Sequence, residues 1–117
     1  MSRTTWMTCT AVLVLASSCA SAAAPERART ETVAAIRAAQ EVGALSHERS
    51  GYHLELAQEQ LTRAEHLIQA GRMIEAERML ARAQADAELA IVLTREAVAQ
   101  AEAEELEARI TAMRERL

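Results

Sequence analysis

The sequence predicts an all-α protein, a short antiparallel bundle of three helices, or helical hairpin, with a long C-terminal helix. Its body is rich in Ala, Glu, Gln, Arg and Leu, which are strong helix formers. Apolar residues recur at steps of three and four, the period of a helix. Only three glycines occur, and they stand between the periodic segments. A β-sandwich needs more aromatic residues than this chain has, and a nucleotide-binding loop needs clustered glycines, so both classes are excluded.

The first 24 residues have the layout of a secretory signal peptide. Arg3 is the only charged residue before Glu26, an apolar run covers residues 8–16, and small residues fill most of 17–24. The alternative is a retained membrane-spanning helix, which needs roughly 20 apolar residues. The apolar run is much shorter than this, so we expect a cleaved leader.

Within the leader, the segment from Leu15 to Cys19 resembles a bacterial lipobox. In such lipoproteins the cysteine becomes the first mature residue and carries acyl chains such as palmitate. The usual pattern has Leu three residues before the cysteine, where this chain has Ala16. The other open possibility is ordinary cleavage after Ala22, which would release a soluble product. Ala20 after the cysteine, rather than Asp, implies the outer membrane instead of the inner one.

The mature body contains no thiol, because Cys9 and Cys19 are the only cysteines in the chain. We therefore expect no disulfide, no zinc cluster and no catalytic cysteine there. The net charge of −4 also argues against a nucleic-acid-binding protein, which is normally basic.

Residues 25–117 are predicted to form a single helical domain. Its helices are expected at about residues 25–42, 52–70 and 72–115. Pro25 suits a first helical turn, and Gly43 and Gly71 suit left-handed helix ends. Residues 43–51 are predicted to form a connector. Alternatively, the second helix starts earlier and Ser46 is its N-cap.

Each helix carries an apolar stripe that predicts its buried face. The stripe of the first helix is Ala28, Thr32, Ala35, Ala39 and Val42. The stripe of the second helix is Leu54, Ala57, Leu61, Ala64 and Ile68. The third helix has two heptad series, one formed by Met73, Leu80, Ala87, Thr94, Ala101 and Ala108, the other by Ala76, Ala83, Ala90 and Ala97. This seam of mostly alanine predicts close helix packing.

The end of the third helix carries a different stripe. The earlier series breaks at Glu104, and an out-of-phase stripe follows, formed by Leu106, Ile110, Met113 and Leu117. Residues 89–98 are apolar on several sides, which predicts either the middle of a three-helix arrangement or a contact with another chain. The stripe has no evident partner within the chain, so we expect a partner-binding or self-association contact; the alternative is a frayed amphipathic end.

The second and third helices resemble a known family. The residues that carry the resemblance run from Ala64 through Gly71, Arg72 and Met73 to Ala90, with alanines at helical spacing. The family consists of short bacterial envelope proteins catalogued as a domain of unknown function. Its members are often lipoproteins and are sometimes fused to an OmpA-like peptidoglycan-binding domain, which we do not expect within these 117 residues. The resemblance covers roughly residues 30 to 105 and implies a location and a shape, but no activity.

The body offers no set of residues for catalysis or metal binding. His47, His53 and His66 include no i, i+4 pair that could hold a metal ion, so we expect surface histidines. No nucleophile, base and oxyanion donor occur at recognisable spacing. The spacings Glu59–Arg63 and Glu105–Arg109 predict solvent-exposed helix pairs. We therefore expect no enzyme activity, no cofactor and no metal site.

Together these patterns predict a non-catalytic cell-envelope lipoprotein on the outer membrane, facing the periplasm. It is expected to act as a helical scaffold, a spacer or a partner-binding adaptor. Its expected partners are the membrane, through a lipid on Cys19, and an envelope protein or a second copy of the chain, but no nucleic acid. The alternative is a soluble periplasmic or secreted helical module that binds a cell-wall or small-molecule ligand.

Overall fold

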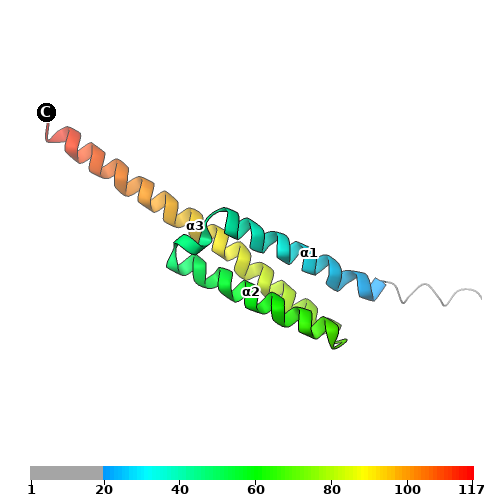
Figure 1. The fold of residues 1–117 in the computed structure, drawn as a ribbon. Coiled ribbons are helices and arrows are strands. Elements are labelled where there is room, and N and C mark those ends of the chain that lie inside the picture. Colours follow the sequence, from blue (N-terminus) through cyan, green and yellow to red (C-terminus); the bar gives the residue numbers. More distant parts are fainter. Residues whose placement is uncertain (1–19) are drawn as a thin grey trace, which may run out of the picture.

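A computed structural model describes residues 20–117, and these contain three α-helices, one 3-10 turn and no strand. The elements are α1 (Ala20–Glu41), η1 (Ala44–Ser46), α2 (Glu48–Gln69) and α3 (Met73–Arg114). Helices α1 and α2 pack along the first half of α3, and the second half of α3 projects beyond them (Figure 1). The predicted all-α fold with a long C-terminal helix is confirmed.

The reversal between α2 and α3 is made by Gly71, as its position predicts. Its φ of 75° is left-handed, a conformation that glycine adopts without steric penalty. Its amide donates to the carbonyl of Ile68 at 3.0 Å, and the amide of Arg72 donates to the carbonyl of Leu67 at 2.9 Å. These two bonds form a Schellman motif, which satisfies the last carbonyls of α2 and turns the chain.

Helix α2 begins at Glu48, four residues before the predicted start, so Gly51 lies inside the helix. The early start is supported by Ser50, whose buried hydroxyl donates to the carbonyl of Ala44 in η1 at 2.7 Å. Ser46 belongs to η1 and is not the helix cap, which is His47 without a side-chain bond. The connector is therefore shorter and more ordered than the sequence suggested.

The start of α1 also differs from the prediction. The helix begins at Ala20, so Pro25 lies inside it rather than in its first turn. Ala is the strongest helix former, and the alanine-rich residues before the proline extend the helix. The bounds of α3 agree with the prediction to within one residue at each end, which is the usual uncertainty of a helix boundary.

The core lies between α3 and the other two helices and is made mostly of alanine. Its buried apolar residues are Ile36, Ala39, Ala44, Leu54, Ala57, Ala64, Ala76, Leu80, Ala83, Ala87, Ala90 and Leu93. Small side chains let the backbones approach closely, and the hydroxyl of Thr32 on α1 lies 3.2 Å from the carbonyl oxygen of Leu80 on α3. The buried apolar residues of this core run from Ile36 to Leu93. A chain of residues 20–117 therefore includes the whole of this core.

The predicted alanine seam of α3 is buried over only part of its length. Burial extends from Ala76 to Thr94, whereas Met73, Ala101 and Ala108 are exposed. Burial ends there because α1 and α2 are shorter than α3: they have 22 residues each, whereas α3 has 42. The last turns of α3 have no helix of the bundle opposite them.

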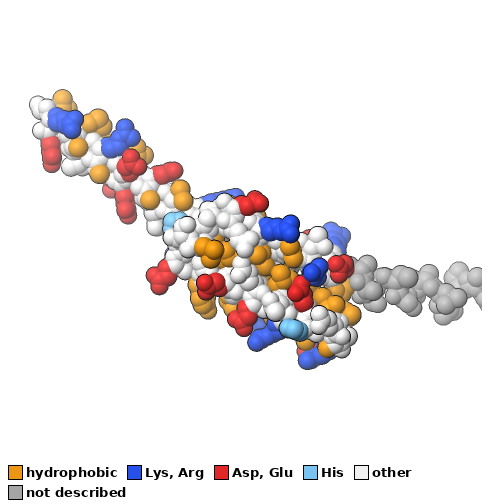
Figure 2. Space-filling model, viewed as in Figure 1, with side chains coloured by type: hydrophobic (Ala, Val, Ile, Leu, Met, Phe, Trp, Pro, Cys, Tyr) orange, Lys and Arg blue, Asp and Glu red, His pale blue; other side chains and the backbone are white. Residues whose placement is uncertain are grey.

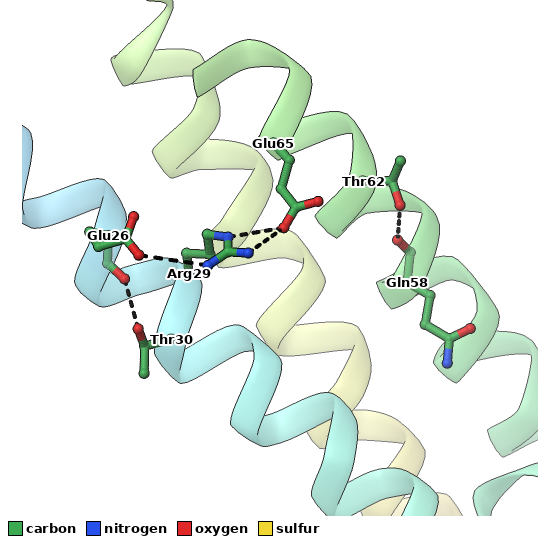
Figure 3. Close-up of polar contacts among 6 residues, drawn as sticks. All are labelled: Glu26, Arg29, Thr30, Gln58, Thr62 and Glu65. Atoms are coloured by element: carbon green, nitrogen blue, oxygen red, sulfur yellow. Dashed lines mark hydrogen bonds and ion pairs between the residues drawn. The ribbon is translucent and has the colours of Figure 1, made fainter. Parts of the chain in front are cut away.

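An ion pair joins α1 to α2 at the rim of the bundle. Arg29 on α1 donates through Nε to Glu65 Oε1 on α2 at 2.9 Å and lies 3.6 Å from Glu26 (Figure 3). The side chains of Arg29 and Glu65 are about 40% exposed and screened by solvent, so the pair contributes little to stability, about 0–1 kcal/mol. The bundle is held by its apolar packing.

Candidate functional site

The strongest candidate site is the part of α3 that projects from the bundle, residues 98–117, which we call the α3 extension. Every residue in this range is exposed. Apolar, acidic and basic side chains alternate along its surface (Figure 2). The extension is helical to Arg114 because its residues are strong helix formers, although no tertiary contact covers it.

The four residues predicted as a contact stripe lie together on one face of the α3 extension. Their spacing of four, three and four places them on one side of the helix. Leu106, Ile110 and Met113 are 43–58% exposed, and Leu117 is fully exposed. The stripe is therefore uncovered in the described chain, and its role as a contact surface stays a prediction.

The exposed apolar face reaches further toward the bundle than the sequence analysis recognised. Ala99 and Ala103 continue the heptad spacing of the stripe, and Leu89 and Val92 on the bundle occupy the same phase and are exposed. Only Glu96 interrupts this series. The apolar residues of segment 89–98 thus divide between two faces, because Ala90, Leu93 and Thr94 face the core. Extending the heptad spacing backwards from Leu106 would have found this face.

Charge is distributed unevenly along the α3 extension. Residues 102–107 carry four glutamates and no basic residue, whereas residues 109–116 carry three arginines and one glutamate. Of the two predicted helix pairs, Glu59–Arg63 is present at 3.8 Å. Among residues 20–117, no ion pair within 4.0 Å joins Glu105 to Arg109. The charges of the extension are therefore available to a partner.

A polar cluster between α2 and α3 was missed by the sequence analysis, which placed His53 on the open surface. Nδ1 of His53 lies 2.8 Å from Asp86 Oδ1, and Gln60 donates through Nε2 to Asp86 Oδ2 at 2.9 Å. Both oxygens of the carboxylate are thus engaged, and His53 and Asp86 are mostly buried. The cluster fastens α2 to α3. Its residues are 26 and 33 positions apart, so no local spacing reveals it.

A shallow concavity of about 550 Å³ lies at the start of α2. Its lining includes Leu45, His47, Arg49, Tyr52 and Glu55. Sites for small organic ligands are usually enclosed and mainly apolar, whereas this surface is open and carries both signs of charge. Within residues 20–117, no three His, Cys, Asp or Glu side chains are grouped so that they could hold a metal ion.

The predicted lipid-attachment residue, Cys19, lies outside the described residues, as does most of the predicted leader. Of the helices in the described part of the chain, none has the length and apolar character needed to cross a membrane.

Comparison with known proteins identifies the family of the chain. Residues 27–106 match the model of a family described as Domain of unknown function (DUF4398). No curated protein and no solved structure gives a significant match. The matched range contains most of α1, all of α2 and the buried half of α3, and it ends at Leu106, the first residue of the stripe. The match covers well over half of the chain, and the chain therefore belongs to the DUF4398 family.

Proposed function

We propose that this protein is a non-catalytic cell-envelope lipoprotein, anchored through Cys19, that uses the α3 extension as a scaffold, spacer or partner-binding surface in the periplasm. The observation that carries this proposal is the exposed apolar stripe on a helix that outruns its own bundle. Regular apolar residues on a solvent-exposed helix favour a helix-to-helix or helix-to-groove contact. The helical part of the extension, residues 98–114, is about 26 Å long at 1.5 Å per residue, so this contact would lie well away from the bundle.

The sequence pattern around Cys19 supports the lipid anchor. Acyl chains on a cysteine contribute about 0.8 kcal/mol for each buried CH₂, enough for several chains to hold a small protein on a membrane. The apolar core of the bundle, from Ile36 to Leu93, lies outside the predicted leader that carries Cys19.

Metabolic labelling with a palmitate analogue tests the anchor. We expect the wild-type chain to be labelled and to fractionate with membranes, and Cys19→Ala to lose both properties. Cys9→Ala is the matched control and is expected to keep them. Unlabelled wild-type protein in the soluble fraction would contradict the anchor and favour the alternative, a soluble secreted module that binds a cell-wall or small-molecule ligand.

Site-specific photo-crosslinking in cells tests the contact surface. A photoreactive residue at Ile110, on the stripe, is expected to give discrete adducts. The same residue at Ala112, on the opposite face of the helix, is the matched control and is expected to give few. Equal adduct patterns from the two positions would show that the stripe is not a contact surface.

A further inference from the structure

We propose that the α3 extension binds the α3 extension of a second copy of this chain in antiparallel orientation. The proposed seam consists of Ala99, Ala103, Leu106, Ile110, Met113 and Leu117. These positions follow the alternating steps of four and three that define the a and d positions of a coiled coil. All six are exposed, and no element of the described chain packs on them. The inference rests on the proposed role of this surface as a contact, and it adds the identity of the partner.

Charge complementarity selects a second copy in antiparallel orientation. A parallel pair would place Glu102 beside Glu107 of the other copy and Arg109 beside Arg114, because these are facing positions of a parallel coiled coil. Like charges in facing positions are destabilising. An antiparallel pair instead brings g positions beside g positions and e positions beside e positions, so Glu102 of each copy lies beside Arg116 of the other. Glu107 and Arg109 each meet their own counterpart near the centre, so two like-charge pairs remain, whereas the parallel pair has four.

The sizes of the side chains indicate the register. Full overlap of the two extensions brings each small side chain of the seam opposite a large one. The facing pairs are Leu106 with Ile110, Ala103 with Met113, and Ala99 with Leu117. The two bundles then lie at opposite ends of the paired helices, so neither bundle obstructs the contact.

Registers displaced by one heptad are less favourable. A shift that brings the two bundles closer sets Glu96 against Met113 of the other copy, which places a charged side chain in the apolar seam. A shift in the other direction leaves both alanines of the seam outside the overlap of the two extensions. The register with Leu106 opposite Ile110 avoids both faults.

Sedimentation equilibrium of residues 20–117 tests the association, since this range contains the whole core described above. We expect a monomer–dimer equilibrium in which Ile110→Glu raises the dissociation constant by about a hundredfold or more, because the seam would bury an unpaired charge. Ala112→Glu adds the same charge on the opposite face and is expected to leave the constant within about threefold. Circular dichroism checks that both variants keep their helix content.

Cysteine pairing tests the orientation, because residues 20–117 contain no native thiol. Under mild oxidation, a mixture of Ala103→Cys and Met113→Cys chains is expected to form the mixed disulfide. Neither chain alone is expected to form a disulfide efficiently. In the antiparallel pair, like positions are separated by about ten residues, or about 15 Å, and a disulfide needs Cα atoms within about 7 Å.

Two sedimentation results would overturn the proposal: a monomer at every concentration, or an equal rise in the dissociation constant from Ile110→Glu and Ala112→Glu. Faster disulfide formation between two copies of the same cysteine variant than between Ala103→Cys and Met113→Cys would also overturn it. Failure of the dimer is distinguishable from failure of the proposed function. A monomeric chain that still gives specific adducts with another protein through Ile110 in cells would retain the adaptor role, and palmitate labelling of Cys19 is independent of both.

Discussion

At the scale of single residues, Asp86 on α3 contacts two side chains of α2. It is the only aspartate in the chain, and it accepts from Gln60 on α2 while pairing with His53. Its substitution leaves polar groups on α2 without their partner in a partly buried site. An orphaned group of this kind costs more than the net value of one hydrogen bond.

We therefore expect Asp86→Ala to lower the free energy of unfolding by about 1–3 kcal/mol. Chemical denaturation of residues 20–117 measures the change. Glu88→Ala is the matched control, because Glu88 lies on the same helix and accepts from Gln84 at 2.9 Å on the exposed surface. The control is expected to change stability by less than about 0.5 kcal/mol. Equal losses would show that the cluster does not fasten α2 to α3.

At the scale of elements, substitution by alanine is expected to have opposite effects on stability at Gly51 and Gly71. Gly51 lies inside α2 with ordinary helical geometry, and an added Cβ would lie 3.6 Å from the carbonyl oxygen of Ala44. Gly71 has φ +75°, and nothing lies within 4 Å of an added Cβ, so strain there would come from the backbone alone. The local conformation, and not the available space, decides the outcome at both positions.

We expect Gly51→Ala to raise the free energy of unfolding by about 0.5–1 kcal/mol, because alanine is the better helix former. Gly71→Ala is expected to lower it by about 1–2 kcal/mol, the cost of a left-handed residue with a Cβ. Thermal and chemical denaturation check both values. Destabilisation by Gly51→Ala would contradict a start of α2 at Glu48.

Helix α3 is expected to have two regions of different local stability. Residues 76–94 are fixed by core packing, whereas residues 98–117 have only their intrahelical hydrogen bonds. Most helical stability in proteins comes from tertiary packing, so the extension should open more readily. Amide hydrogen exchange is expected to be fast in the extension of a monomeric Ile110→Glu chain and slower in the dimer. Uniform exchange along α3 would contradict this division.

At the scale of the whole molecule, the bundle is independent of the extension. The buried apolar residues of its core run from Ile36 to Leu93, so a chain of residues 20–97 should keep this core. We expect this chain to unfold cooperatively with a free energy within about 1 kcal/mol of that of residues 20–117 measured as a monomer. A chain that ends at residue 89 is the contrasting case, because it lacks Ala90, Leu93 and Thr94. It is expected to lose several kcal/mol, as when large buried groups are deleted.

The bundle was largely predictable because its signals are local. The three helices follow from apolar residues at steps of three and four, and the end of α2 follows from Gly71, whose left-handed conformation requires glycine. The exposed stripe beginning at Leu106 was predictable for the same reason, since it is out of phase with the seam before it. Spacing along one helix determines these features without reference to any other part of the chain.

Only the tertiary structure decided which parts of these patterns are covered. The seam of α3 continues in sequence to Ala108, but its burial ends at Thr94 because α1 and α2 are shorter helices. The contact of His53 and Gln60 with Asp86 depends on residues that are distant in sequence and meet when α2 packs on α3. A helical period specifies which side chains share a face. What lies opposite that face is set by the lengths and positions of the other helices.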